Sequence, residues 1–294
     1  MNAANFLRTR LLRLAFVLAL AASGSFRAAA ADVSTPAGRP TIFVCGDSTS
    51  KSPAPIQGWG TPIAAYFDPA KVTVSNEGHG GRSSRTYYDG DWPRVLPKIN
   101  PGDYVLIVFG INDGTTLGGI GDETREVAGQ TEHTYGWYMA KMAADAREKG
   151  ARVWLLTVTP RDIWTNPKAK FKDAEIVSKE AGYNPADDKI ERGTGGGKYT
   201  QWTKETGKML GVPVLDLTNL LADKYEKMGR EKVMVNYKDH NHTFPAGADI
   251  VAASIVSGLK AFKNSPFTAM LSDKGRALET ADAKYIAEND SVAK

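Results

Sequence analysis

Cysteine is almost absent from this sequence, since Cys45 is the only one among 294 residues. A single cysteine excludes an internal disulfide. Cys45 lies in an apolar, β-branched run, so we expect a packed and inert thiol. Its neighbours do not resemble a cysteine–histidine catalytic pair. The sequence therefore gives no indication of cysteine chemistry.

The sequence also lacks an apolar run long enough to cross a bilayer comfortably. An apolar run does occur at Leu14–Ala22, between a basic start and four alanines at Ala28–Ala31. The basic residues are Arg8, Arg10 and Arg13. This order is typical of a secretory signal peptide, which we predict for residues 1–31. The mature protein is then expected to be secreted or periplasmic, without stable membrane association; a single membrane anchor is the alternative.

Neither sign of charge dominates. The formal net charge is only +4, and this modest excess does not indicate a nucleic-acid partner. The four histidines are scattered and show no HExxH spacing. No Walker or Gly-x-Gly-x-x-Gly pattern follows the first predicted strand. We therefore expect no metal, no other cofactor and no nucleic acid.

Five β-like runs alternate with helical patterns. The predicted strands are Thr41–Cys45, Val72–Asn76, Tyr104–Phe109, Val153–Val158 and Val212–Leu217. The predicted helices cover residues 58–67, 92–99, 134–149, 199–210, 218–229 and 246–263. Such alternation predicts an α/β protein with a five-stranded parallel sheet, helices on both faces and one domain over residues 40–263. Residues 115–133 are expected to form a loop, residues 160–198 fit no regular pattern, and residues 264–294 are expected to be a loosely attached tail.

A serine follows the first predicted strand. Gly46 and Asp47 end the apolar run, and Ser48 comes next, at the carboxyl end of the strand. In an open α/β sheet, this edge is where ligands bind. A serine hydroxyl is inert at neutral pH unless a base, a group that orients the base and donors for an oxyanion surround it. Ser48 is a candidate nucleophile if the chain supplies these partners.

His242 is the candidate general base, because an imidazole can take the serine proton at neutral pH and return it to a leaving alcohol. Asp239 stands three residues earlier, and on a tight loop its carboxylate can reach Nδ1 of His242 and fix the tautomer. His240 is the competing candidate. We favour His242, because Asp239 needs a loop turn to reach the imidazole.

Two more strand ends supply candidate donors for the oxyanion. Gly81 lies in the glycine-rich loop after the second strand, and its backbone N–H permits close approach. Asn112 follows the third strand and offers a side-chain amide. Together with the backbone N–H of Ser48, these groups form a candidate oxyanion hole.

Four short blocks, in this order, resemble those of the SGNH (GDSL-type) hydrolases. They are Gly-Asp-Ser-Thr at 46–49, Gly-Arg-Ser-Ser-Arg at 81–85, Gly-Ile-Asn-Asp at 110–113 and Asp-His-Asn-His at 239–242. The second block and the continuation of the last as Thr-Phe-Pro-Ala-Gly are similar to the rhamnogalacturonan acetylesterase branch. The resemblance implies a flavodoxin-like three-layer α/β/α sandwich and a metal-free serine esterase. It also implies catalytic roles for the residues identified above: Ser48, Gly81, Asn112, Asp239 and His242.

The expected substrate is an acetylated plant polysaccharide, above all pectic rhamnogalacturonan, and the protein is expected to be a monomer. Basic residues on the predicted active edge are candidates for holding uronic acids, although ordinary solvated charge explains them equally well. They are Lys51, Arg82, Arg85 and Arg161. Aromatic residues that could face sugar rings, or belong to the core, are Trp59, Tyr87, Tyr88 and Trp164. Acetylxylan, another glycan or a lipid ester are alternative substrates, and a non-catalytic glycan-binding protein is the alternative of another class.

Overall fold

The computed structural model describes residues 38–166, 168–170, 179 and 182–289. The predicted signal peptide, residues 1–31, lies outside the described residues. Within the described part of the chain, no helix combines the length and apolar character needed to cross a bilayer.

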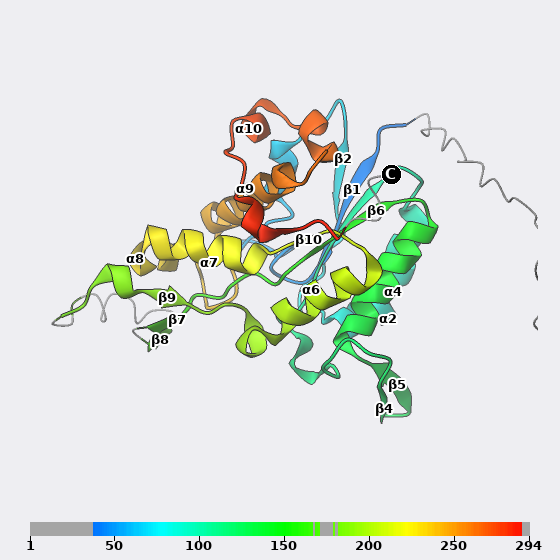
Figure 1. Ribbon diagram of the computed structural model, residues 1–294, viewed down its shortest axis with the longest axis horizontal. Coiled ribbons are helices and arrows are strands. Elements are labelled where there is room, and N and C mark those ends of the chain that lie inside the picture. Colours follow the sequence, from blue (N-terminus) through cyan, green and yellow to red (C-terminus); the bar gives the residue numbers. More distant parts are fainter. Residues whose placement is uncertain (1–37, 167, 171–178, 180–181, 290–294) are drawn as a thin grey trace, which may run out of the picture. The chain divides into compact units, whose positions relative to one another are not determined.

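A six-stranded sheet forms the centre of the fold (Figure 1). Its strands in spatial order are β2 (Thr73–Asn76), β1 (Thr41–Gly46), β3 (Tyr104–Val108), β6 (Arg152–Leu156), β10 (Val214–Leu215) and β11 (Ile286–Ala287). All pairs from β2 to β10 are parallel, and β11 pairs antiparallel with β10. The order of the parallel strands is that of a flavodoxin-like fold, which confirms the predicted fold class. The sequence predicts five parallel strands, and the structure adds a sixth, antiparallel strand, β11.

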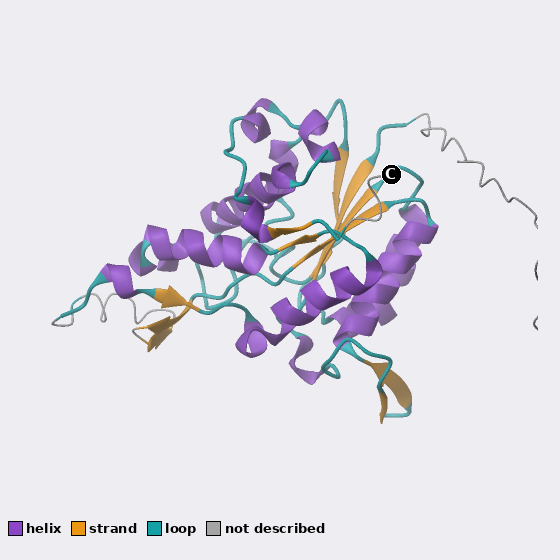
Figure 2. Cartoon of the chain, in the orientation of Figure 1, coloured by secondary structure: helices purple, strands orange, loops and turns teal. Residues whose placement is uncertain are grey.

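Alternation of side chains along each strand divides the core in two. In β1, for example, Ile42 and Val44 face one layer, whereas Phe43 and Cys45 face the other. The first layer contains the 3₁₀ helix Pro62–Tyr66, α7 (Leu217–Met228) and α9 (Pro245–Ala261). The second contains α2 (Ser84–Gly90), α3 (Trp92–Val95), α4 (Tyr135–Glu148) and α6 (Lys198–Leu210). Figure 2 shows these helices on the two sides of the strands.

Cys45 is fully buried in the second layer, and burial raises the pKa of its thiol to about 12. The expectation of a packed cysteine is confirmed. A neutral thiol is a poor nucleophile, so Cys45 contributes packing and no chemistry at neutral pH.

Three predicted segments differ from the structure. The helix expected over 58–67 shrinks to the 3₁₀ helix Pro62–Tyr66. The expected loop 115–133 contains a hairpin of β4 (Thr124–Val127) and β5 (Gln130–His133). The unassigned segment after residue 160 contains a small antiparallel sheet of β7 (Ile163–Asn166), β8 (Lys168–Lys170) and β9 (Lys189–Ile190). These elements are only two to five residues long, too short to show a clear hydrophobic period, so their pattern in sequence is weak.

The segment after α9 is not a loose tail, which corrects that prediction for residues 264–289. Phe267 is fully buried, and its ring centroid lies 4.8 Å from that of Trp154 and 5.2 Å from that of Tyr104. Ile286 in β11 pairs with Leu215 in β10. The short helix α10 (Asp273–Arg276) lies between Phe267 and β11 in the sequence. Another short helix, α8 (Arg230–Met234), follows α7. The tail therefore completes both the core and the sheet.

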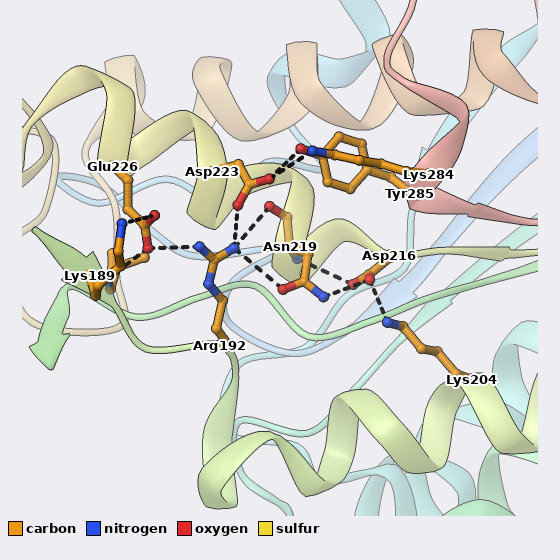
Figure 3. A network of polar contacts seen from close by, with 10 residues as sticks. Lys189, Arg192, Lys204, Asp216, Asn219, Asp223, Glu226, Lys284 and Tyr285 are labelled. Atoms are coloured by element: carbon orange, nitrogen blue, oxygen red, sulfur yellow. Dashed lines mark hydrogen bonds and ion pairs between the residues drawn. The ribbon is translucent and has the colours of Figure 1, made fainter. Parts of the chain in front are cut away.

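A polar network on α7 joins this C-terminal segment to the segment before α6 (Figure 3). The hydroxyl of Tyr285 donates to Asp223 at 2.6 Å. Arg192 binds the same Asp223 and also Glu226, one turn further along α7, at 2.8 Å. Both carboxylates thus belong to one helix and hold two distant parts of the chain against it.

Removing the Phe267 ring tests whether the C-terminal segment is part of the core. Phe267→Ala is expected to lower the free energy of unfolding by about 3–5 kcal/mol, because it leaves a cavity among buried aromatics. Urea denaturation measures this, and Thr268→Ala, at an exposed neighbour, is the control, expected within about 0.5 kcal/mol of wild type. Equal stability of the two variants would contradict a packed segment.

Candidate active site

Ser48 lies in a tight turn directly after β1. The carboxylate of Asp47 accepts hydrogen bonds at 2.8 Å from the backbone N–H and the hydroxyl of Thr49. The carbonyl of Asp47 accepts the N–H of Ser50 and of Lys51, each at 3.1 Å. This turn, closed by the aspartate side chain, fixes the backbone on both sides of Ser48 and leaves its side chain partly exposed.

His242 comes from the loop between α8 and α9. Asp239 Oδ1 accepts the backbone N–H groups of Asn241 and His242, each at 2.8 Å, which curls the loop. The next residue, Thr243, pairs with Gln57 through two hydrogen bonds, of 2.8 and 2.9 Å. Because Gln57 belongs to the loop after Ser48, these bonds anchor the histidine loop beside the serine turn.

The structure brings Ser48, His242 and Asp239 into one line of contacts. Nε2 of His242 lies 2.9 Å from Oγ of Ser48, and Nδ1 lies 2.8 Å from Oδ2 of Asp239. The imidazole that reaches the serine is thus His242, whereas His240 is exposed and its carbonyl accepts the N–H of Asp162. Hydrogen bonds from the loop N–H groups and from His242 outweigh the effect of burial and lower the pKa of Asp239. Asp239 is therefore an anion at neutral pH and can stabilise an imidazolium.

Gly81 and Asn112 follow strands β2 and β3, which flank β1 on its two sides in the sheet. Gly81 has φ of +77°, in the region that favours glycine, and nothing lies within 4 Å of the position that a Cβ would take. The amide nitrogen of Asn112 donates to the carbonyl of Arg82 at 3.0 Å. An amide nitrogen has two hydrogens, so one N–H of Asn112 remains for another acceptor.

Asp113 was not predicted to have a role, yet its carboxylate binds the residue at the end of the Gly81 loop, Ser84. Its Oδ1 accepts the backbone N–H of Ser84 at 2.9 Å and the hydroxyl of Ser84 at 2.5 Å. Ser84 is the first residue of α2. Together with the bond from Asn112 to Arg82, this contact ties the loop after β3 to the loop after β2. The only signal in the sequence was that Asp113 follows Asn112 in the same block.

Two buried carboxyl groups, Asp47 and Asp113, lie beneath the site. Burial raises the pKa of each to about 6, against hydrogen bonds from Thr49 to Asp47 and from Ser84 to Asp113 that lower it. No described residue provides a hydrogen bond to Oδ2 of Asp113. The Thr116 side chain also lowers the pKa of Asp113, so burial is the cause of the net rise.

Most of the predicted cationic rim is already paired. Arg82 contacts Asp91 at 2.7 Å, Arg85 lies 3.2 Å from Glu132, and Arg161 binds both carboxylate oxygens of Glu191 at 2.8 Å. Arg161 is held in a bidentate contact, the geometry that would otherwise serve a ligand carboxylate. A substrate-binding role for these arginines stays a prediction. Lys51 differs, because its ammonium donates to the backbone carbonyl of Asn76 at 3.0 Å.

For three of the four aromatic residues, the structure favours the core over a contact with sugar rings. Trp59, Tyr87 and Trp164 are at most 1% exposed and belong to the core. Trp164, for example, lies beneath the guanidinium of Arg230, 5.0 Å from the ring centroid. Tyr88 is partly exposed and packs edge-on against Trp137. Aromatic rings bury large apolar areas, and this outweighed any role at the surface.

Among the residues that the structure describes, no three histidine, cysteine, aspartate or glutamate side chains are grouped so as to hold a metal ion. The expectation of a metal-free mechanism stays a prediction.

The arrangement defines a class of protein. A hydroxyl, an imidazole and a carboxylate in sequence, beside N–H donors at the carboxyl edge of a parallel sheet, form the working layout of a serine hydrolase. The model of the GDSL-like Lipase/Acylhydrolase family matches residues 44–232. The chain belongs to this family and is a carboxylic ester hydrolase.

Two curated relatives cover most of the chain. A rhamnogalacturonan acetylesterase of Emericella nidulans is 30% identical over 74% of this chain and 84% of its own length. The rhamnogalacturonan acetylesterase RhgT of Bacillus subtilis is 29% identical over 71% of this chain and 79% of its own. Among solved structures, protein YxiM of Bacillus subtilis superposes with a TM-score of 0.56 at 23% identity, over 77% of this chain and 57% of that one. This last likeness supports the fold alone.

The proton of Asp113 gives a prediction for stability. Since its pKa is raised to about 6 from 3.8, the folded protein binds this proton more tightly than the unfolded chain does. Raising the pH from about 4 to 6 therefore destabilises the folded state, by up to about 3 kcal/mol for a shift of this size. Asp113→Asn keeps the acceptor for Ser84 and removes this titration, so it is expected to reduce the slope, while Asp47 keeps its own contribution.

Urea denaturation between pH 4 and 7 measures the slope. Asp122→Asn removes an exposed carboxylate and is the matched control, expected to leave the slope of the wild type. An unchanged slope in Asp113→Asn would show that Asp113 is ionised throughout this range.

Proposed function

We propose that this protein is a serine esterase that removes acetyl groups from a plant cell-wall polysaccharide, rhamnogalacturonan. The observation that carries the proposal is the 2.9 Å contact between His242 Nε2 and Ser48 Oγ, with the Asp239 carboxylate on the other ring nitrogen. The names of the relatives support the choice of acetyl ester and polymer. The N-terminal pattern of residues 1–31 supports export, since such a polymer lies outside the cell.

In the proposed reaction, Ser48 Oγ attacks the acetyl carbonyl carbon while His242 Nε2 takes the hydroxyl proton. The carbonyl oxygen becomes an oxyanion, and N–H groups of Ser48, Gly81 and Asn112 stabilise it. The tetrahedral intermediate collapses, the C–O bond to the sugar breaks, and His242 gives its proton to the sugar oxygen.

Water completes the cycle. His242 takes a proton from a water molecule, whose oxygen attacks the acetyl group on Ser48. Collapse of the second intermediate releases acetic acid and returns the proton to Ser48 Oγ. Asp239 keeps the imidazole in one tautomer and stabilises its cationic form in both halves, without taking a proton itself.

Replacing the nucleophile is the first test. Ser48→Ala is expected to lower kcat for acetate release from acetylated rhamnogalacturonan by at least about 10³-fold, and to abolish labelling by a fluorophosphonate. Ser257→Ala, on α9, is the matched control and is expected to keep both properties. Full activity of Ser48→Ala would end the proposal, and labelling without acetate release from any glycan would leave an esterase of another substrate.

The second test concerns the oxyanion. Asn112→Ala is expected to lower kcat about 10²- to 10³-fold with little change in KM, because the lost N–H acts on charge that exists only in the transition state. Steady-state kinetics on 4-nitrophenyl acetate measure both constants, and thermal unfolding checks that the variant is folded. A rise in KM with unchanged kcat would instead assign Asn112 to substrate binding.

Acetylxylan is the second candidate substrate, because the same chemistry serves any acetylated glycan. Acetate release from acetylated rhamnogalacturonan, acetylxylan and long-chain esters, compared by kcat/KM, distinguishes them. We expect the uronic-acid polymer to be the best substrate. A preference for the neutral xylan would overturn this choice and leave the mechanism intact.

A further inference from the structure

A basic hollow of about 530 Å³ lies beside the serine turn, and the mechanism above does not use it. Three segments form its walls: the loop after Ser48, the loop after β2, and α3 with the turn that follows it. Its charged and histidine side chains are Lys51, Glu77, His79, Asp91, Arg94 and Lys98. We call it the β2 hollow.

The β2 hollow opens next to the candidate nucleophile. Gly80 lines it, and a Cβ on Gly80 would lie 3.7 Å from Cβ of Ser48. Ser52 also lines it, and its hydroxyl donates to the carbonyl of Ser48 at 2.7 Å. A polymer with an ester group at Ser48 would therefore place its neighbouring atoms at the mouth of this hollow.

The two carboxylates of the hollow are already engaged by cations. Glu77 receives both bonds of a bidentate contact from Lys98, at 2.9 and 3.0 Å. Asp91 contacts His79 and Arg82, each at 2.7 Å, and also Arg94. Burial would raise the pKa of both acids, and these contacts reverse that and lower it. Both are therefore anions at neutral pH, each neutralised by its partners.

Positive charge remains after this pairing. The hollow contains three cationic side chains, Lys51, Arg94 and Lys98, and two carboxylates, so its net charge is +1 with His79 neutral. Arg82, which does not line the hollow but contacts Asp91, adds one more positive charge. In the part of the chain that the structure describes, Lys51 makes no ion pair, and its ammonium donates to a neutral carbonyl. The side chains of Arg94 and Lys98 are 69% and 52% exposed, so their unused N–H groups are accessible.

We propose that the β2 hollow binds a carboxylate of the substrate, with Lys51 and Arg94 as its main donors. This rests on the proposed function and extends it: the ligand is a uronic acid in the chain of the acetylated polymer. Rhamnogalacturonan contains galacturonic acid, which carries one carboxylate per residue, whereas xylan's backbone sugar carries none. The hollow therefore selects an acidic glycan over a neutral one, and it orients the ester over Ser48.

The test compares an acidic with a neutral substrate in the same variant. For Lys51→Gln, the ratio of kcat/KM on acetylated rhamnogalacturonan to kcat/KM on 4-nitrophenyl acetate is expected to fall about fivefold to tenfold, the effect of one charge-assisted hydrogen bond at a solvated site. The loss should lie in KM for the polymer. Lys51→Arg is expected to recover most of it, and Arg94→Gln to lower the ratio similarly.

Two controls make the result specific. Lys149→Gln removes the same charge at an exposed position after α4 and is expected to leave the ratio unchanged. With polymer whose uronate carboxyls have been reduced to alcohols, wild type and Lys51→Gln should become equal. Added salt should lower the wild-type ratio, because it screens exposed charges.

Binding gives a measurement that does not depend on turnover. In the Ser48→Ala background, Lys51→Gln is expected to weaken binding of oligogalacturonate about fivefold to tenfold in calorimetry. If wild type is active on the acidic polymer and Lys51→Gln leaves both the ratio and this Kd unchanged, the inference is wrong and the proposed function stands. If wild type hydrolyses 4-nitrophenyl acetate but not the acidic polymer, the proposed substrate fails and the inference fails with it.

Discussion

The in-register pairing of β1 with β3 is the constraint on which the whole site depends. Gly46 lies opposite Val108, so both chains leave the sheet at the same level. Ser48 and Asn112 follow these two ends. The β2 strand joins through the pair Val44 and Asn76, which brings the glycine loop to the same edge. Three segments far apart in sequence thus meet because parallel strands keep their carboxyl ends together.

Strand positions and the site blocks could be predicted from the sequence because both are local signals. A β-branched run followed by Gly46 and Asp47 defines its own end, and the spacing of Asp239 and His242 suffices for a curled loop. The partners of surface charges could not be predicted in this way. Arg161 faces Glu191 across a segment with no regular pattern, and nothing near either residue indicates the pair.

The aromatic residues show the opposite limit. Trp59 belongs to the helix predicted over residues 58–67 and also lies near Ser48 in sequence, and it is only 1% exposed. Its burial is set by tertiary packing, because Trp59 belongs to the same core layer as Ile63 and Tyr66, and its backbone N–H donates to the carbonyl of Thr49 at 2.9 Å. Without the fold, a tryptophan beside an active site reads equally well as core or as ligand contact.

The antiparallel β11 lies near the C-terminal end of the described residues, which affects when the sheet can be completed during synthesis. β10 pairs over only two residues, Val214 and Leu215, and without β11 its outer edge would be left open. Open strand edges invite association with other chains. A polypeptide emerging from the ribosome cannot cover this edge until Ile286 and Ala287 have been released. A nascent or C-terminally truncated form therefore has an unpaired, aggregation-prone strand edge that β11 covers in the full-length protein.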